Sequence, residues 1–180
     1  MADEIEHARL AFGLASAYAQ QEIGPGALDV RGSIDAELDR FAIIEALVHE
    51  ACVGETLAAI EAREAAAHAQ DPSVAAALEQ IAADELRHAQ LGWRSLRWML
   101  DLGDDRLRSF ALARLDAALR EVTAATIEDG VPASLRAHGL LDDQLRTSVR
   151  RQAIVEVLGP CAAALRRCHE LGQPTACARA

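Results

Sequence analysis

The chain has 180 residues, of which 51% are apolar and 26% charged, a composition typical of one globular domain with a hydrophobic core. Its net charge of −10 argues against a nucleic-acid-binding surface, because such surfaces carry an excess of lysine and arginine. No apolar stretch reaches the roughly 20 residues that a membrane-spanning helix needs, and the N-terminus has no basic segment of a signal peptide, so we expect a cytoplasmic protein.

Alanine, leucine, glutamate and arginine dominate the chain and predict an all-α fold. Glycine and proline clusters divide it, so we expect helices over residues 2–21, 35–69, 73–101, 105–128 and 142–171, with a short turn near 133–138. Ser33, Asp71 and Asp104 are the expected N-caps of the second, third and fourth helices. Pro160 removes a hydrogen bond inside the last helix and predicts a bend at Gly159-Pro160.

The longest predicted helices have about 30 residues and a length of about 45 Å, as in a helix bundle. In the second helix, apolar residues recur at intervals of three and four, which gives the helix one buried face. We therefore predict an antiparallel helix bundle.

A segment of eleven residues at 2–12 recurs at 83–93 with six identical positions. Each copy holds a glutamate and a histidine three residues apart, Glu4 with His7 and Glu85 with His88. On a helix this spacing puts both side chains on one face, one turn apart, where they can contribute to one metal site. One such pair is common by chance, but its recurrence inside a repeat predicts that both pairs bind metal. Carboxylates and imidazoles with no nearby thiolate suit iron or manganese at least as well as zinc.

The two Glu-x-x-His copies resemble those of the ferritin-like superfamily of di-iron carboxylate proteins, in particular the rubrerythrin-like bacterial domains. This resemblance implies that a helix with a single glutamate precedes each Glu-x-x-His helix. Glu50 lies 35 residues before Glu85 and Glu55 lies 30 before it, so both are candidate ligands, and Glu50 is preferred. Glu55 is expected to be a carboxylate that moves with oxidation state, or an outer partner of a histidine. Gly54 beside it would leave room for a neighbouring helix.

The family spacing would put a single-glutamate helix about 35 residues before Glu4, where this sequence has no residues. The resemblance therefore implies that the first bundle helix is missing. Residues 1–103 would then form three of the four ferritin-like helices, and residues 104–180 a C-terminal helical extension packed on the same domain. One metal position could be completed by Glu4, Glu50, Glu85 and His88. The other position would keep His7 and the bridging glutamates. A second chain in a homodimer, a C-terminal helix or an upstream segment of a longer gene product could supply what is missing.

The resemblance implies a di-iron or di-manganese site with oxidoreductase activity toward dioxygen or peroxide. The alternative is a non-catalytic helical remnant that serves as an oligomerisation module, because a missing helix would leave an apolar groove. Glu121 and Glu156 lie in apolar helices and are reserve ligands. His49 is next to Glu50 in the sequence but about 100° round the helix from it, so it is expected in the outer shell of the site or on the surface and not among the ligands.

Overall fold

The computed structural model describes residues 2–27, 29, 31 and 39–170, and every regular element in this part of the chain is a helix. The elements are α1 (Ala2–Ala19), α2 (Arg40–Ala46), the π-helix η1 (Leu47–Gly54), α3 (Glu55–His68), α4 (Pro72–Leu102), α5 (Asp105–Ala124), the 3-10 helix η2 (Ala133–His138), α6 (Asp143–Ala153), the π-helix η3 (Ile154–Leu158) and α7 (Gly159–Glu170). The predicted all-α fold is confirmed. None of the described helices is long and apolar enough to cross a membrane.

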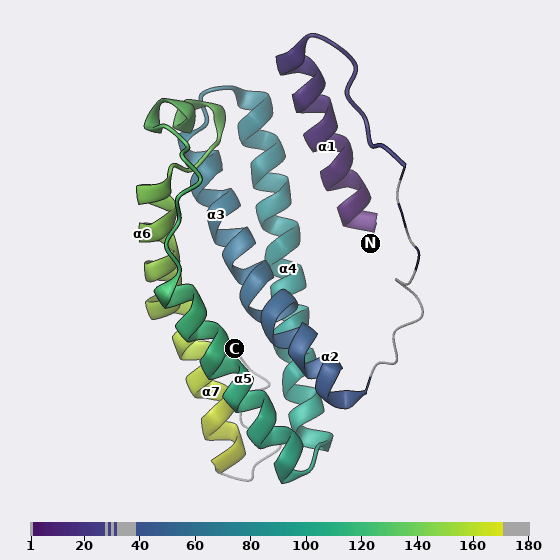
Figure 1. The fold of residues 1–180 in the computed structure, drawn as a ribbon, viewed down its shortest axis with the longest axis vertical. Coiled ribbons are helices and arrows are strands. Elements are labelled where there is room, and N and C mark those ends of the chain that lie inside the picture. Colours follow the sequence, from purple (N-terminus) through teal and green to yellow (C-terminus); the bar gives the residue numbers. More distant parts are fainter. Residues whose placement is uncertain (1, 28, 30, 32–38, 171–180) are drawn as a thin grey trace.

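Four long helical rods surround the hydrophobic core (Figure 1). Two of them are composite, because the backbone stays helical where α2, η1 and α3 join and where α6, η3 and α7 join. The other two are α4 and α5. Fully buried side chains come from all four rods: Ile44, Val48, Leu96, Leu115 and Leu158. The part of the chain after residue 103 therefore contributes to the main core and does not merely cover it.

Helix α1 lies outside this arrangement, alongside α4 (Figure 1). None of its residues is buried, although it contains Leu10, Phe12 and Leu14. Its position against α4 is nevertheless what brings the two copies of the repeated segment together.

Most predicted helix boundaries agree with the structure to within a few residues. Asp71 and Asp104 cap α4 and α5 as predicted, each accepting a hydrogen bond from a backbone N–H in the first turn. The predicted cap Ser33 lies outside the described residues, and Asp39 caps α2 in the same manner. Helix α5 ends at Ala124, earlier than predicted, and the backbone of the next residue, Ala125, is extended.

The two π-helical turns are the main departure from the predicted regular helices. The N–H of Glu55 bonds to the carbonyl of Glu50, and the N–H of Gly159 to that of Ile154, each five residues back instead of four. At Gly159-Pro160, where the sequence predicts a bend, the structure has a π-turn immediately before Pro160, whose ring nitrogen has no hydrogen to donate.

Candidate metal centre

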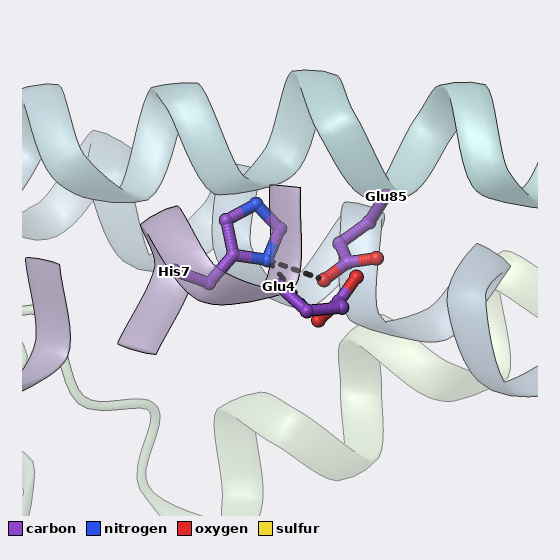
Figure 2. Close-up of side chains that lie close together, drawn as sticks. All are labelled: Glu4, His7 and Glu85. Atoms are coloured by element: carbon purple, nitrogen blue, oxygen red, sulfur yellow. Dashed lines mark ion pairs between the residues drawn. The ribbon is translucent and has the colours of Figure 1, made fainter. Parts of the chain in front are cut away.

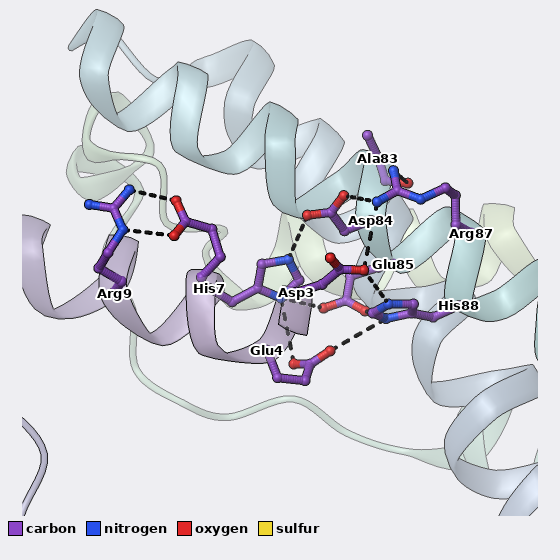
Figure 3. A network of polar contacts seen from close by, with 10 residues as sticks. Asp3, Glu4, His7, Arg9, Ala83, Asp84, Glu85, Arg87 and His88 are labelled. Carbon is purple, nitrogen blue, oxygen red and sulfur yellow. Dashed lines mark hydrogen bonds and ion pairs between the residues drawn. The ribbon is translucent and has the colours of Figure 1, made fainter. Parts of the chain in front are cut away.

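The two Glu-x-x-His pairs face each other between α1 and α4 (Figure 3). The imidazole rings of His7 and His88 lie with their centroids 6.5 Å apart. Both pairs lie one turn apart on their own helix, as the spacing predicts, and the antiparallel course of α1 beside α4 sets them opposite each other.

Each glutamate of the repeat contacts both histidines. Glu4 places Oε2 3.5 Å from Nδ1 of His7 and Oε1 3.4 Å from Nδ1 of His88. Glu85 places Oε1 3.3 Å from Nδ1 of His7 and Oε2 3.1 Å from Nδ1 of His88 (Figures 2 and 3). The two carboxylates therefore span the space between the two rings, one oxygen toward each.

The other nitrogen of each ring is held by an aspartate from the opposite helix. Nε2 of His7 lies 3.0 Å from Oδ2 of Asp84, and Nε2 of His88 lies 3.1 Å from Oδ2 of Asp3. A carboxylate accepts hydrogen bonds, so each Nε2 donates to its aspartate, and Nδ1 is the nitrogen of each ring that faces the glutamates and would ligate a metal. Sequence reasoning did not assign a role to these aspartates. Their signal was present, since an aspartate precedes the glutamate in both copies of the repeat.

The aspartate contacts also shift protonation equilibria. Its hydrogen bond to His7 holds the pKa of Asp84 below the ordinary value, and Arg87 adds to this effect. Burial opposes the charged form of His88, but its hydrogen bonds with Asp3 and Glu85 outweigh burial and raise the pKa of this imidazole. The network thus concentrates negative charge around the two rings.

Glu55 joins the centre from α3. Ligating atoms of Glu55, Glu85 and His88 lie within 4.8 Å of one another, and so do those of Glu4, His7 and Glu85. Glu85 belongs to both groups. Burial, a hydrogen bond with Glu85 and the negative charge of Glu85 together raise the pKa of Glu55 to about 7. Three carboxyl groups, those of Glu4, Glu55 and Glu85, therefore gather around the two imidazole rings.

Glu50, the preferred ligand from the sequence, is exposed and belongs to neither group. A residue count along the chain assumes a constant turn per residue, whereas η1 inserts a wider turn between Glu50 and Glu55. The backbone at Glu55 is fixed by its neighbour Thr56, which donates to the carbonyl of Cys52 at 2.6 Å and accepts from the indole N–H of Trp93 on α4 at 3.2 Å. The structure therefore brings Glu55, and not Glu50, to the histidines.

Gly92 allows α4 to approach η1 closely at this level. A Cβ atom at Gly92 would lie 2.7 to 2.8 Å from the side chain and backbone of Ala51. The sequence had suggested Gly54 for such a role. The space beside Gly54 is instead taken by its own helix, because a Cβ there would lie 3.0 Å from the carbonyl oxygen of His49 in the π-turn.

The remaining candidate ligands lie elsewhere. His49 contacts Glu45 at 3.4 Å and Arg114 at 3.2 Å, and Glu121 approaches it to 3.9 Å. Glu156 accepts a hydrogen bond from the neighbouring side chain of Gln152 on the last helical rod. None of these residues is in the two groups that could hold a metal among the described residues.

The centre is enclosed on one side and open on the other. The side chains of His7 and Glu85 are each 11% exposed, whereas that of Glu4 is 56% exposed. Comparisons of the chain with protein-family models, with curated proteins and with solved structures found no match. What the centre can do chemically therefore has to be argued from its geometry.

Proposed function

We propose that this chain is a ferritin-like metalloprotein that binds two metal ions, iron or manganese, between α1, α3 and α4. The observation that carries the proposal is the contact of Glu4 and Glu85 with both His7 and His88, one oxygen toward each ring. Carboxylates that span two imidazoles in this way suit a pair of ions better than a single ion. An all-helical protein with Glu-x-x-His on two facing helices agrees with this assignment.

The donor chemistry fits such ions. The five candidate ligands are three carboxylates and two imidazoles, a set that suits iron and manganese. The thiol of Cys52 takes no part, since it is buried in the core and burial raises its pKa to about 12. The gathering of three carboxyl groups around the two rings supports the same interpretation, because bound cations would balance their negative charge.

The two metal positions would be unequal. His88, Glu55 and Glu85 would hold one ion, and His7, Glu4 and Glu85 the other, with Glu4 also within reach of the first. The first position has the more enclosed carboxylates, because Glu4 is more than half exposed. We expect the ion beside His88 to bind more tightly and the ion beside His7 to exchange more readily.

When bound, such ions supply Lewis-acid and one-electron chemistry toward small oxidants, dioxygen or peroxide. The protein's own part is to hold the ligands and limit water. Asp3 and Asp84 orient the two rings through Nε2, and Glu85 is packed with little exposed surface. The exposed edge at Glu4 is the side from which a small molecule would reach the centre.

The first test counts metal ions on the chain. Protein stripped with a chelator should take up about two Mn²⁺ or, without oxygen, about two Fe²⁺ per chain, measured by elemental analysis after desalting. Glu85→Gln should lose most of this uptake, because Glu85 serves both positions. Glu79→Gln makes the same chemical change at an exposed site on the same helix and should bind normally.

Circular dichroism shows whether the Glu85→Gln protein is still folded. As an independent test, His88→Ala should abolish metal binding at the position beside His88. Stoichiometric binding that survives both substitutions would contradict the assignment. So would a wild-type chain that takes up no ions.

A further inference from the structure

Helix α1 differs from the other α-helices in how it is attached to the protein. None of its 18 residues is buried, whereas each of the α-helices α2 to α7 contributes buried apolar side chains. Ile5 and Tyr18 of α1 are 69% and 55% exposed. Leu10, Phe12 and Leu14 are half-buried, so hydrophobic burial, the usual source of helix docking, contributes less to holding α1 than to holding the other α-helices.

Polar contacts at the two ends of α1 connect it to the rest of the protein. At its N-terminal end, Asp3 and His7 contact His88, Asp84 and Glu85 at distances of 3.0 to 3.3 Å (Figure 3). At its C-terminal end, the hydroxyl of Tyr18 lies 3.0 Å from Nδ1 of His138 on η2. Most of the contacts that hold α1 thus belong to the candidate metal centre.

The carboxyl groups at this junction outnumber the groups that can carry positive charge. The carboxyl groups that meet there come from both sides: Asp3 and Glu4 from α1, and Glu55, Asp84 and Glu85 from α3 and α4. The nearby groups that can carry positive charge are Arg87 and the two histidines. Like charges drawn together in a partly enclosed site repel each other, and a divalent cation ligated from both sides removes that repulsion.

We propose that metal binding controls the docking of α1 on α4. This inference rests on the proposed metal centre. Glu4 and His7 are ligands carried by α1, and Glu55, Glu85 and His88 are ligands carried by the core rods, so bound ions join the core to a helix that has no fully buried apolar side chain. Loss of the ions leaves the carboxylates unbalanced and lets α1 move away from α4.

Thermodynamic linkage gives the size of the effect. If α1 must leave α4 for the ions to dissociate, free metal at about one hundred times its Kd makes that opening about one hundredfold rarer. Backbone amides of α1 should then exchange with deuterated water up to about one hundredfold more slowly in the metal-loaded protein. Amides in the middle of α4 and α5, such as those of Leu96 and Leu115, lie in the core and should exchange alike in both states.

Hydrogen exchange with mass spectrometry on the full chain tests this directly. The protein is compared after chelation and after saturation with Mn²⁺, and bound ions are counted in the same samples. Tyr18→Phe removes the hydrogen bond to His138 at the other end of α1, keeps the edge-on contact of the two rings and touches no metal ligand. In this variant we expect α1 to exchange faster than in the wild type after chelation, and Mn²⁺ to restore most of its protection.

Two results would overturn the inference and are distinguishable from each other. If Mn²⁺ binds in the expected amount but exchange in α1 is the same with and without it, the metal centre stands and its control of α1 is refuted. If no Mn²⁺ binds, the proposed function fails and the inference fails with it. Protection that rises equally in α1, α4 and α5 would also refute a local effect on α1.

Discussion

His7 of α1 and Asp84 of α4 are 77 positions apart in the chain, and their side chains meet with Nε2 and Oδ2 3.0 Å apart. Asp3 and His88 make the reciprocal contact at 3.1 Å. The aspartate of each copy of the repeat therefore supports the histidine of the other copy. This crossed arrangement orients both rings and ties the positions of the two helices together.

Replacing Asp84 with asparagine should weaken the metal position beside His7. The amide keeps the size of the side chain but loses the charge that orients the ring and increases its basicity, which we expect to reduce Mn²⁺ affinity about 10- to 100-fold at that position. The metal-free protein is titrated with Mn²⁺, and free Mn²⁺ is followed by electron paramagnetic resonance. This titration measures the Mn²⁺ affinity of both positions. Asp101→Asn removes a carboxylate from an exposed site near the end of the same helix and is the matched control. Equal affinities for the Asp84→Asn, Asp101→Asn and wild-type proteins would show that the contact has no role in binding.

Glu55 and Glu50 offer a sharper comparison, because they lie five residues apart on one composite helix and only Glu55 reaches the histidines. Glu55→Gln should reduce the affinity of the tighter position or remove one of the two ions, since it takes a carboxylate from the group around His88. Glu50→Gln should leave the affinity of that position and the number of bound ions unchanged. The readout is the number of Mn²⁺ ions retained after desalting, and the reverse result would restore the ligand choice that the sequence favoured.

The part of the centre that could be predicted from sequence is the part determined by helical spacing. Glu and His three residues apart share a face in any α-helix, so His7 and His88 could be paired with their glutamates before the fold was known. The repeat also indicated that the two pairs act together. Their meeting between α1 and α4 follows from an antiparallel pair of helices.

Helical spacing could not decide whether Glu50 or Glu55 is the third carboxylate of the centre. It depends on the hydrogen bond from Glu55 to the carbonyl of Glu50, a π-turn whose presence composition does not reveal. The sequence also does not reveal that α1 contributes no buried residue to the core. Its sequence contains enough apolar residues for a buried face, and only tertiary packing shows that none of them is buried.

Gly92→Ala should destabilise the fold. Its methyl group would overlap Ala51 of η1, at 2.7 to 2.8 Å, so α4 and η1 would have to move apart at the level just beyond His88. Overpacking of this kind costs about 1–3 kcal/mol. Gly13→Ala is the control, because nothing lies within 4 Å of a Cβ there and alanine favours helix. Urea denaturation followed by circular dichroism should show a lower free energy of unfolding for Gly92→Ala alone, and equal stability of the two variants would contradict the close contact.

Asp142 should make the stability of the protein depend on pH in acid solution. Its side chain caps α6 by accepting from the N–H of Leu145 at 3.2 Å, and its ion pair with Arg136 lowers the pKa from 3.8 to about 2. A carboxyl group whose pKa is lowered by folding stabilises the folded state above its unfolded pKa. This contribution is therefore complete above about pH 5 and is lost as the pH falls through 3.8 toward about 2, where the folded protein also takes up the proton.

Asp142→Asn removes this titration and keeps an oxygen that can cap α6. We expect the variant to be less stable than the wild type at neutral pH and the difference to shrink steadily below pH 3.8. Urea denaturation at a series of pH values measures the difference. Asp105→Asn, at a 92% exposed side chain paired with Arg108, controls for the loss of one negative charge. A difference between wild type and Asp142→Asn that stays constant down to about pH 2 would mean that Arg136 does not stabilise the ionised carboxylate in the folded protein, because only a shifted pKa makes the two stabilities converge.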